Sequence, residues 1–452
     1  MSEKPTIAAL ATPAGESAIA LLRISGPLCA GLTRQAFGRA ADPIPRQACL
    51  GKYRDQAGNI LDEALYTYFQ EGHSYTGEAI LEIACHGNPL IARKILEDLQ
   101  ARGCQLAEPG EFTRTAFLNG KMDLSQAEAV MELIHAKSEK AIEVAHRHLR
   151  GGIGDKIRDF IEKLTRLCAH LEAYIDFPEE DLPEEDQSGP LAELNGLLQD
   201  INQLIDTHQY HDALTQGVRL AIVGAPNAGK SSLLNALLDQ DRAIVSDTPG
   251  TTRDFISERI TFGGLNLELI DTAGLRKPAS DLESQGIERS LQVAGEADFT
   301  LLVLDSTEDL PELPAEALEN LTPDNAVVCE NKTDLPNSQT FSDYQPALPH
   351  LRISALTTEG LAGLKQHLHT RLEALVELPG EATVVVNARH RQLLSQGREL
   401  LLEGRQKLQD SIPAELAASD LREALQTLAQ ITGAFDTEDL LDVIFQDFCI
   451  GK

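Results

Sequence analysis

The chain has 452 residues, of which 42% are hydrophobic and 24% are charged. This is the composition of a folded protein rather than a disordered one. A single hydrophobic core stops growing at roughly 250 to 300 residues, so we expect two or three domains. The formal net charge of −31 opposes non-specific binding to nucleic acid or anionic lipid, because such binding depends on Lys and Arg.

The seven cysteines are scattered and include no C-x-x-C pair, so the sequence indicates neither a zinc ribbon nor a redox dithiol. We therefore expect a reducing, cytoplasmic location. The start of the chain has no uninterrupted apolar core, and no segment approaches 18 consecutive apolar residues. These features predict neither a signal peptide nor a membrane span.

The first part of the chain has a mixed pattern. From Thr6 to about Phe117, short apolar runs alternate with Gly and Pro turns, which is typical of an α+β domain. From about Ser125 the period becomes helical, and a long helix is predicted by the stripe Ile153, Ile157, Ile161, Leu164, Leu167 and Leu171. Residues 178–190 combine prolines with acidic residues, so we expect a solvated loop there.

Between Val218 and Leu375, short apolar runs (VRLAIV, LNLELI, FTLLVL, NAVVCE and LRIS) alternate with helical stretches. This is the βαβ rhythm of a parallel sheet covered on both faces. Helical spacing resumes after about residue 384, so the α/β domain is expected as an insertion into an α-helical domain. The predicted division is 1–119 for an α+β domain, 120–215 and 379–452 for the two halves of the helical domain, and 216–378 for the inserted domain.

The segment GAPNAGKS, residues 224–231, follows an apolar run and opens a helical one. Its glycines permit a turn whose N–H groups face phosphates, and the helix N-terminus adds its positive dipole end. We expect Lys230 to reach the β and γ oxygens of a nucleotide and the Ser231 hydroxyl to bind Mg²⁺. The alternative is a glycine loop that opens a helix and binds nothing.

Two further segments extend this phosphate site. Asp271–Gly274 (DTAG) follows the run LNLELI, where the carboxylate can hold the Mg²⁺ water shell and the Gly274 amide can sense the γ-phosphate. Thr252, in TPGTTRD between the two motifs, offers a second hydroxyl ligand to the metal. We expect this loop to be ordered only when the γ-phosphate is present.

Base choice is predicted from Asn331–Asp334 (NKTD) after the run AVVCE. A carboxylate at Asp334 can accept two hydrogen bonds from guanine, whose donors adenine lacks, so GTP is expected rather than ATP. Ser354 and Ala355 fit the second base contact. The nucleotide contacts expected from all these motifs are Asn227, Ala228, Gly229, Lys230, Ser231, Ser232, Ser246, Asp247, Thr248, Pro249, Gly250, Thr251, Thr252, Asp271, Thr272, Ala273, Gly274, Asn331, Lys332, Thr333, Asp334, Ser354, Ala355 and Leu356.

Many regulatory GTPases have a Gln directly after the DTAG-like motif to orient water, but here that position is Leu275. Glu283 is a candidate general base for the missing function, and the plainer alternative is a solvated loop residue. Asn227 offers an oxygen beside the phosphates that would suit a monovalent cation. Its alternative is a simple turn residue.

These motifs, together with TIAALATPAG, LLRISG, GEFTRTAFLNGKMDLSQAEA, AYIDFPEED, GIERS and the terminal FCIGK, resemble the MnmE (TrmE) family of tRNA-modifying GTPases along essentially the whole chain. The resemblance implies a homodimer paired through an N-terminal folate-binding domain. It also implies K⁺-stimulated GTP hydrolysis on transient dimerisation of the GTPase domains. With a flavin-dependent partner, MnmG (GidA), the family adds an aminomethyl or carboxymethylaminomethyl group to C5 of the wobble uridine of certain tRNAs.

The resemblance also assigns individual residues. It implies K⁺ contacts at Asn227, Ser246, Thr248 and Thr251, Mg²⁺ ligands at Ser231 and Thr252, and 5-formyl-tetrahydrofolate contacts at Arg23, Glu82, Lys121 and Lys452. Cys449 matches the family's terminal cysteine and is a catalytic candidate whose chemical role stays open. From the residues alone, Arg23, Glu82 and Lys121 could equally be surface ion-pairing residues.

Two other functions compete with this interpretation. A regulatory GTPase switch in ribosome or RNA assembly would be expected to carry a basic RNA-binding module, whereas this chain is acidic and ends in CIGK. A P-loop kinase is disfavoured by NKTD, which predicts guanine.

Overall fold

The computed structural model describes residues 4–176, 188–215, 217–225, 227–238, 257–262, 265–271, 297–310, 321–376, 380, 384–410, 412–434, 441, 444–446 and 448–451. Two compact units divide the chain. One comprises Met1–Met131, His148–Leu198 and Leu393–Lys452, and the other comprises Glu132–Arg147 and Gln199–Gln392. The chain thus leaves the first unit and returns to it, as an inserted domain requires. The four-part division by residue number stays a prediction.

The first unit begins with an α+β domain, as the alternating runs predicted. Its sheet has the order β3-β4-β5-β2-β1-β6, and neighbours pair antiparallel except β1 with β6. The strands are β1 (Ile7–Leu10), β2 (Ile19–Ser25), β3 (Cys49–Arg54), β4 (Ile60–Phe69), β5 (Ile80–His86) and β6 (Gln105–Leu106). Buried side chains of the sheet share one core with helices α1 (Cys29–Phe37) and α2 (Pro89–Ala101).

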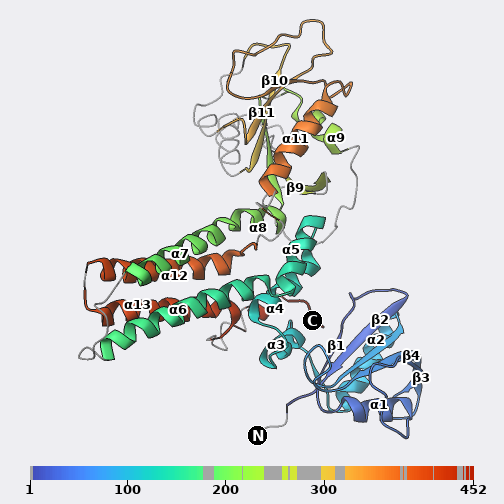
Figure 1. Cartoon of the computed structure of the whole chain (residues 1–452). Coiled ribbons are helices and arrows are strands. Elements are labelled where there is room, and N and C mark those ends of the chain that lie inside the picture. Colours follow the sequence, from blue (N-terminus) through green and yellow to red (C-terminus); the bar gives the residue numbers. More distant parts are fainter. Residues whose placement is uncertain are drawn as a thin grey trace, which may run out of the picture. The chain divides into compact units, whose positions relative to one another are not determined.

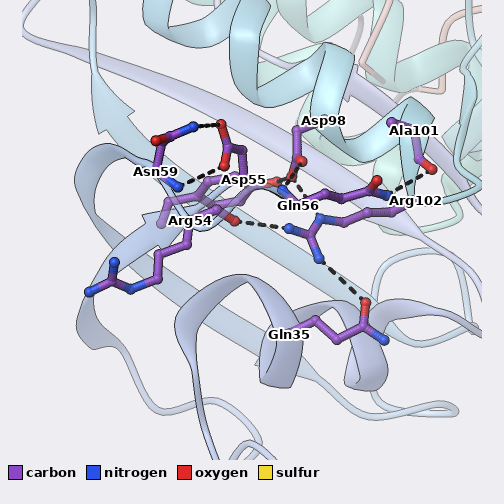
Figure 2. Close-up of polar contacts among 9 residues, drawn as sticks. Gln35, Arg54, Asp55, Gln56, Asn59, Asp98, Ala101 and Arg102 are labelled. Carbon is purple, nitrogen blue, oxygen red and sulfur yellow. Dashed lines mark hydrogen bonds and ion pairs between the residues drawn. The ribbon is translucent and has the colours of Figure 1, made fainter.

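A buried polar network fixes the β3–β4 turn to α2 (Figure 2). The Asp98 carboxylate accepts hydrogen bonds from the Tyr53 hydroxyl at 2.8 Å, the Gln56 amide at 3.0 Å and Arg102 Nε at 2.7 Å. Arg102 also donates from Nη2 to the Arg54 carbonyl at 2.9 Å. Burial and the neighbouring Asp98 raise the pKa of Tyr53, so the hydroxyl remains a donor. Both oxygens of the Asp98 carboxylate therefore accept hydrogen bonds, which offset the free-energy cost of burying its charge.

Helices follow the sheet domain: α3 (Glu111–Leu118), α4 (Leu124–His135), α5 (Glu139–Leu149), α6 (Gly152–Asp176), α7 (Ser188–Asp206), α12 (Ala388–Gln409) and α13 (Ala414–Ala429). The stripe predicted along α6 is its packed face, where Ile157 and Leu164 are fully buried. Figure 1 shows α13 beside α6, and Arg422 Nε donates to Glu172 across this pair at 2.8 Å. Segments far apart in sequence therefore build one helical layer.

The predicted loop at residues 178–190 is wrong at its end. Residues 178–187 lie outside the described residues, but Ser188, Gly189 and Pro190 already belong to α7. A proline is tolerated in the first turn of a helix, because the N–H that it lacks has no partner within the helix there. Composition alone therefore placed the boundary too late.

The second unit contains a six-stranded sheet of order β12-β11-β10-β7-β9-β8. Its strands are β7 (Val218–Gly224), β8 (Ser257–Phe262), β9 (Leu265–Asp271), β10 (Phe299–Asp305), β11 (Ala326–Asn331) and β12 (His350–Arg352). All neighbours are parallel except the edge strand β8, which pairs antiparallel with β9 and was not among the predicted runs.

Both faces of this sheet are covered. Leu220 and Ile222 of β7 join a core with α8 (His208–Thr215), α9 (Lys230–Leu238) and α11 (Leu361–Val376). Their neighbours in sequence, Ala221 and Val223, join a separate core on the other face. Burial of alternate residues on two faces is the expected result for a parallel sheet. Among the described helices, none combines the length and apolar character that crossing a membrane requires.

Candidate functional site

The loops that carry the predicted motifs leave one edge of the second sheet. Parallel strands place their carboxyl ends together, and register pairs Gly224 with Val303, Ile222 with Asp271, and Asp305 with Asn331. Strand β7 lies between β9 and β10. The strands that follow β7 in the chain therefore lie on both sides of it, β8 and β9 on one side and β10 to β12 on the other. Such a switch point forms the crevice in which open parallel sheets bind ligands.

The phosphate loop has the backbone that its glycines and Asn227 allow. Asn227 and Gly229 adopt left-handed φ values of 64° and 94°, and α9 begins directly afterwards at Lys230. A Cβ atom at Gly229 would lie 2.1 Å from Asn331 Nδ2, so only glycine fits. Lys230 is buried, with its Nζ donating to the carbonyls of Gly224 and Ala225 at 2.8 Å each. Its ammonium is therefore held against the loop that would surround the phosphates.

Asn331 joins the phosphate loop to the base-recognition segment. This buried side chain donates from Nδ2 to the Ala228 carbonyl at 2.9 Å and accepts at Oδ1 from the Ala355 amide at 3.0 Å. Both partners of Asn331 are backbone groups, so these two hydrogen bonds do not depend on the side chains at positions 228 and 355. Asn331 thus sets the distance between the two halves of the expected nucleotide site.

Lys332 is positioned by a residue that the sequence interpretation missed. Asp305, the last residue of β10, forms an ion pair with Lys332 Nζ and accepts from Thr307 Oγ1 at 2.7 Å. Burial would raise the pKa of Asp305, but these hydrogen bonds outweigh it and hold that pKa below its usual value. The available signal was an acidic residue directly after an apolar run at the motif-bearing edge.

The rest of the base segment is near these residues. Asp334 is exposed, and the Thr333 amide donates to the Ile353 carbonyl at 3.2 Å. Ser354 is buried and accepts from the Thr357 amide at 3.0 Å, whereas Leu356 is 82% exposed. The exposed Asp334 carboxylate can accept hydrogen bonds from the N–H donors of a nucleobase such as guanine.

Several predicted residues cannot be placed in this geometry. Outside the described residues lie Ser246, Asp247, Thr248, Pro249, Gly250, Thr251, Thr252, Thr272, Ala273, Gly274, Glu283 and Lys452. Asp271 is described only as the last residue of β9. Ser231 and Ser232 are exposed in the first turn of α9, and the Ser231 hydroxyl is an oxygen donor of the type that Mg²⁺ prefers.

The end of the chain is held against the N-terminal domain of the first unit. Arg23 of β2 donates from Nε and Nη2 to Glu82 of β5 at 3.0 and 2.9 Å, and from Nη1 to the Gly451 carbonyl at 3.3 Å. A Cβ atom at Gly451 would lie 2.7 Å from the Cα atom of Ala11. The Cys449 side chain is exposed. The terminal segment, two residues after the exposed Cys449, is therefore held at the Arg23–Glu82 pair through the Gly451 carbonyl.

Lys121 reaches a loop beside the same arginine. Its Nζ donates to the Gly72 carbonyl at 2.6 Å, and the Gly72 amide donates to the Gly77 carbonyl at 2.8 Å. Tyr75, within this loop, has its ring 5.7 Å from the Arg23 guanidinium carbon. Three of the four predicted folate contacts are thus connected: Arg23 and Glu82 by their ion pair, and Lys121 through the loop that carries Tyr75.

The parallel sheet, the phosphate loop at its switch point and the interrupted helical domain define a P-loop GTPase inserted into a helical protein. Family models agree: residues 6–121 match the GTP-binding protein TrmE N-terminus, and residues 124–449 match the MnmE helical domain.

Whole-chain relatives carry the same name. The tRNA modification GTPase MnmE of Opitutus terrae is 46% identical over 448 residues, covering 99% of each chain. Those of Akkermansia muciniphila and Aquifex aeolicus are 43% and 41% identical, each again covering 99% of both chains. The chain belongs to the MnmE family of tRNA modification GTPases, and its activity as a GTPase follows.

Proposed function

We propose that GTP hydrolysis in the inserted domain powers addition of an aminomethyl or carboxymethylaminomethyl group to C5 of the wobble uridine of certain tRNAs. The flavin-dependent partner MnmG performs this chemistry together with the chain, which acts as a homodimer. The observation that supports this proposal most directly is the contact between Arg23 and Gly451, because it brings the exposed Cys449 segment to the predicted folate residues.

In this proposal the nucleotide is held by residues at the edge of the second sheet. Lys230 and the amides around Gly229 bind the phosphates, and Asp334 accepts hydrogen bonds from guanine. Mg²⁺, bound through Ser231 and Thr252, supplies positive charge to the phosphate oxygens when it is present. Asn331 keeps the phosphate and base contacts at the spacing of one nucleotide, since it binds backbone groups of both.

Leu275 stands where many regulatory GTPases have the Gln that orients the attacking water, so hydrolysis needs another residue for this task. We assign orientation of the attacking water to Glu283, and we assign to Asn227 a contact with K⁺, which also binds Ser246, Thr248 and Thr251. The left-handed φ of 64° at Asn227 supports a specialised loop conformation, because non-glycine residues are uncommon there. Dimerisation of the GTPase domains would exclude water from this site and strengthen its electrostatics.

The terminal segment belongs to the second half of the proposal. Arg23, Glu82, Lys121 and Lys452 bind 5-formyl-tetrahydrofolate, and Cys449 stays a catalytic candidate. An Arg whose guanidinium donates from two nitrogens to one carboxylate oxygen and lies over aromatic rings suits a planar, anionic ligand. The chain's charge of −31 leaves contact with tRNA phosphates to a local basic patch or to the partner.

The deciding experiment measures GTP turnover in K⁺ and then in Na⁺ at equal ionic strength, with wild type, Glu283→Ala and the neighbouring control Asp281→Ala. We expect faster turnover in K⁺ and a loss of about 10²- to 10⁴-fold for Glu283→Ala with GTP binding retained. Asp281→Ala should resemble wild type. Equal rates in the two salts would remove the cation mechanism.

The modification step needs its own measurement. Wild type and Cys449→Ser are incubated with the flavin-dependent partner, tRNA, a one-carbon-loaded folate and GTP, and the wobble nucleoside is analysed by mass spectrometry. We expect a modified uridine with wild type and GTP turnover without modification in the variant. A variant that modifies tRNA at the wild-type rate would remove Cys449 from the chemistry.

A further inference from the structure

A cluster of metal-ligand side chains lies away from the nucleotide loops, on the helix that precedes β7. The ligand atoms of His208, His211 and Asp212 lie within 4.8 Å of one another. All three belong to α8, and His211 and Asp212 lie three and four residues after His208, so both side chains neighbour that of His208 on the helix surface. We propose that these three residues form a Zn²⁺-binding site.

Hydrogen bonds orient both imidazole rings. His208 Nδ1 lies 3.2 Å from the Val386 carbonyl, which can only accept a hydrogen bond, so this nitrogen carries the proton. His211 Nε2 lies 3.2 Å from the Glu132 carboxylate, so this nitrogen is the donor of the second ring. When both rings are neutral, the lone pairs are therefore on His208 Nε2 and His211 Nδ1. Metal-binding histidines are typically held in this way, with the other nitrogen on a carboxylate or a carbonyl.

The other two ring nitrogens both approach one carboxylate. His208 Nε2 lies 3.3 Å from Asp212 Oδ2, and His211 Nδ1 lies 3.7 Å from Asp212 Oδ1. Within the part of the chain that the structure describes, His211 Nδ1 is buried and has no hydrogen-bond partner. A buried polar nitrogen without a partner is costly. A metal ion between the three side chains would use that nitrogen.

The donor set selects the metal. Two neutral imidazoles and one carboxylate are a ligand set of three-residue zinc sites, in which a water molecule takes the fourth position. Glu132 adds a second negative charge next to His211, so the site offers charge compensation for a divalent ion. Zn–N bonds are about 2.0 to 2.1 Å, so the ligand atoms need only move closer together by small side-chain rotations.

A proton is the competing occupant. Burial alone would lower the pKa of His211, but Asp212 and Glu132 outweigh it and raise that pKa to about 9. Zn²⁺ therefore has to displace a proton, as metals do at most histidine ligands. An experiment must therefore distinguish two states of His211. In one it is protonated between the Asp212 and Glu132 carboxylates, and in the other it binds the metal.

The position of the site indicates its purpose. Thr207, directly before α8, accepts a hydrogen bond from the Val386 amide at 3.2 Å, and the Val386 carbonyl faces His208. Residues before β7 and residues after α11 are thus joined here. Bound Zn²⁺ would fix the segments by which the chain enters and leaves the inserted GTPase domain.

The test uses the full chain, treated with a chelator, and titrates ZnCl₂ by calorimetry in excess Mg²⁺. All proteins carry Cys449→Ser, because that exposed thiol is itself a zinc ligand. We expect one Zn²⁺ per chain, at least about 100-fold weaker binding in Asp212→Asn and in His211→Gln, and about 10- to 100-fold weaker binding in Glu132→Gln. The control is Glu373→Gln, because His369 and Glu373 form an exposed ion pair of the same i,i+4 spacing at 3.1 Å.

Co²⁺ provides the second measurement, since four-coordinate Co²⁺ absorbs visible light strongly. We expect these bands in the parent protein and in Glu373→Gln, and their loss in Asp212→Asn. Zn²⁺ should also raise the Tm of the parent protein and leave that of Asp212→Asn unchanged. If His211→Gln fails to fold, Asp212→Asn still gives the comparison, because its side chain is 47% exposed. Absence of zinc binding in the parent, or equal binding in Asp212→Asn, overturns the proposal.

Discussion

Replacing Asn331 by alanine should uncouple the phosphate loop from the base segment. The change removes the acceptor of the Ala355 amide, at 3.0 Å, and the donor to the Ala228 carbonyl, at 2.9 Å. The side chain is 2% exposed, so water does not replace it without local opening. Each buried group left unpaired costs about 1 to 3 kcal/mol, and two such groups give a total of about 2 to 6 kcal/mol.

Hydrogen–deuterium exchange measures this loss at the affected amide. A loss of about 1 to 3 kcal/mol at Ala355 corresponds to exchange faster by about 5- to 150-fold, since 1.4 kcal/mol is a factor of ten. The Ser354 amide is an internal reference, because it donates to the Glu359 carbonyl at 2.9 Å and not to Asn331. Guanine nucleotide affinity should fall in parallel, because both halves of the site lose their common support.

The control for this change is Asn337→Ala, which removes an exposed side chain from the loop that follows the same motif. Surface substitutions of this kind usually stay within about 0.5 kcal/mol. If Ala355 exchanged equally fast in Asn331→Ala, Asn337→Ala and wild type, Asn331 would not hold the two segments together and the reasoning from its hydrogen bonds would be refuted.

Three other changes have directions set by the structure. Gly451→Ala should release the terminal segment, because the new Cβ atom would lie 2.7 Å from Ala11; faster carboxypeptidase digestion with unchanged GTP turnover is expected, and digestion at the wild-type rate would contradict the contact. Asp98→Ala should destabilise the N-terminal domain by about 3 to 5 kcal/mol, because it leaves the buried Arg102 side chain without its carboxylate partner; urea unfolding checks this, with Glu97→Ala, which removes a 63% exposed carboxylate from the same helix, as the control. Asp305→Asn should lower the Tm at pH 6, whereas wild type and variant should converge as the pH falls below 3.8, because a carboxylate of lowered pKa stabilises only while ionised; a constant difference across this range would rule out the ion pair.

The sequence predicted the second sheet well because its signals are local. Each apolar run before a motif became a parallel strand, and the glycines and Asn227 predicted the loop between β7 and α9. Strand β8 was not predicted because the first three of its six residues, SERITF, are polar and only the last three alternate between apolar and polar. An antiparallel edge strand needs less apolar character than a central parallel one.

The contacts that organise the two sites were not predictable in the same way. Asp305 ends its strand as many polar residues do, and only the position of the neighbouring strand β11 shows that Lys332 lies beside it. Arg23 and Gly451 are separated by 428 positions in the chain, and no periodicity connects them. Pairing of that kind depends on how whole elements pack, so it becomes visible only in three dimensions.

The contacts at the chain's end and those at the phosphate loop belong to different compact units. Arg23, Glu82 and Gly451 all belong to the first compact unit, whereas Lys230 and Asn331 belong to the second. The hydrogen bonds that position the terminal segment therefore share no residue with those that position the phosphate loop. Substitutions at Gly451 and at Asn331 lie in separate networks, so their effects on stability should add.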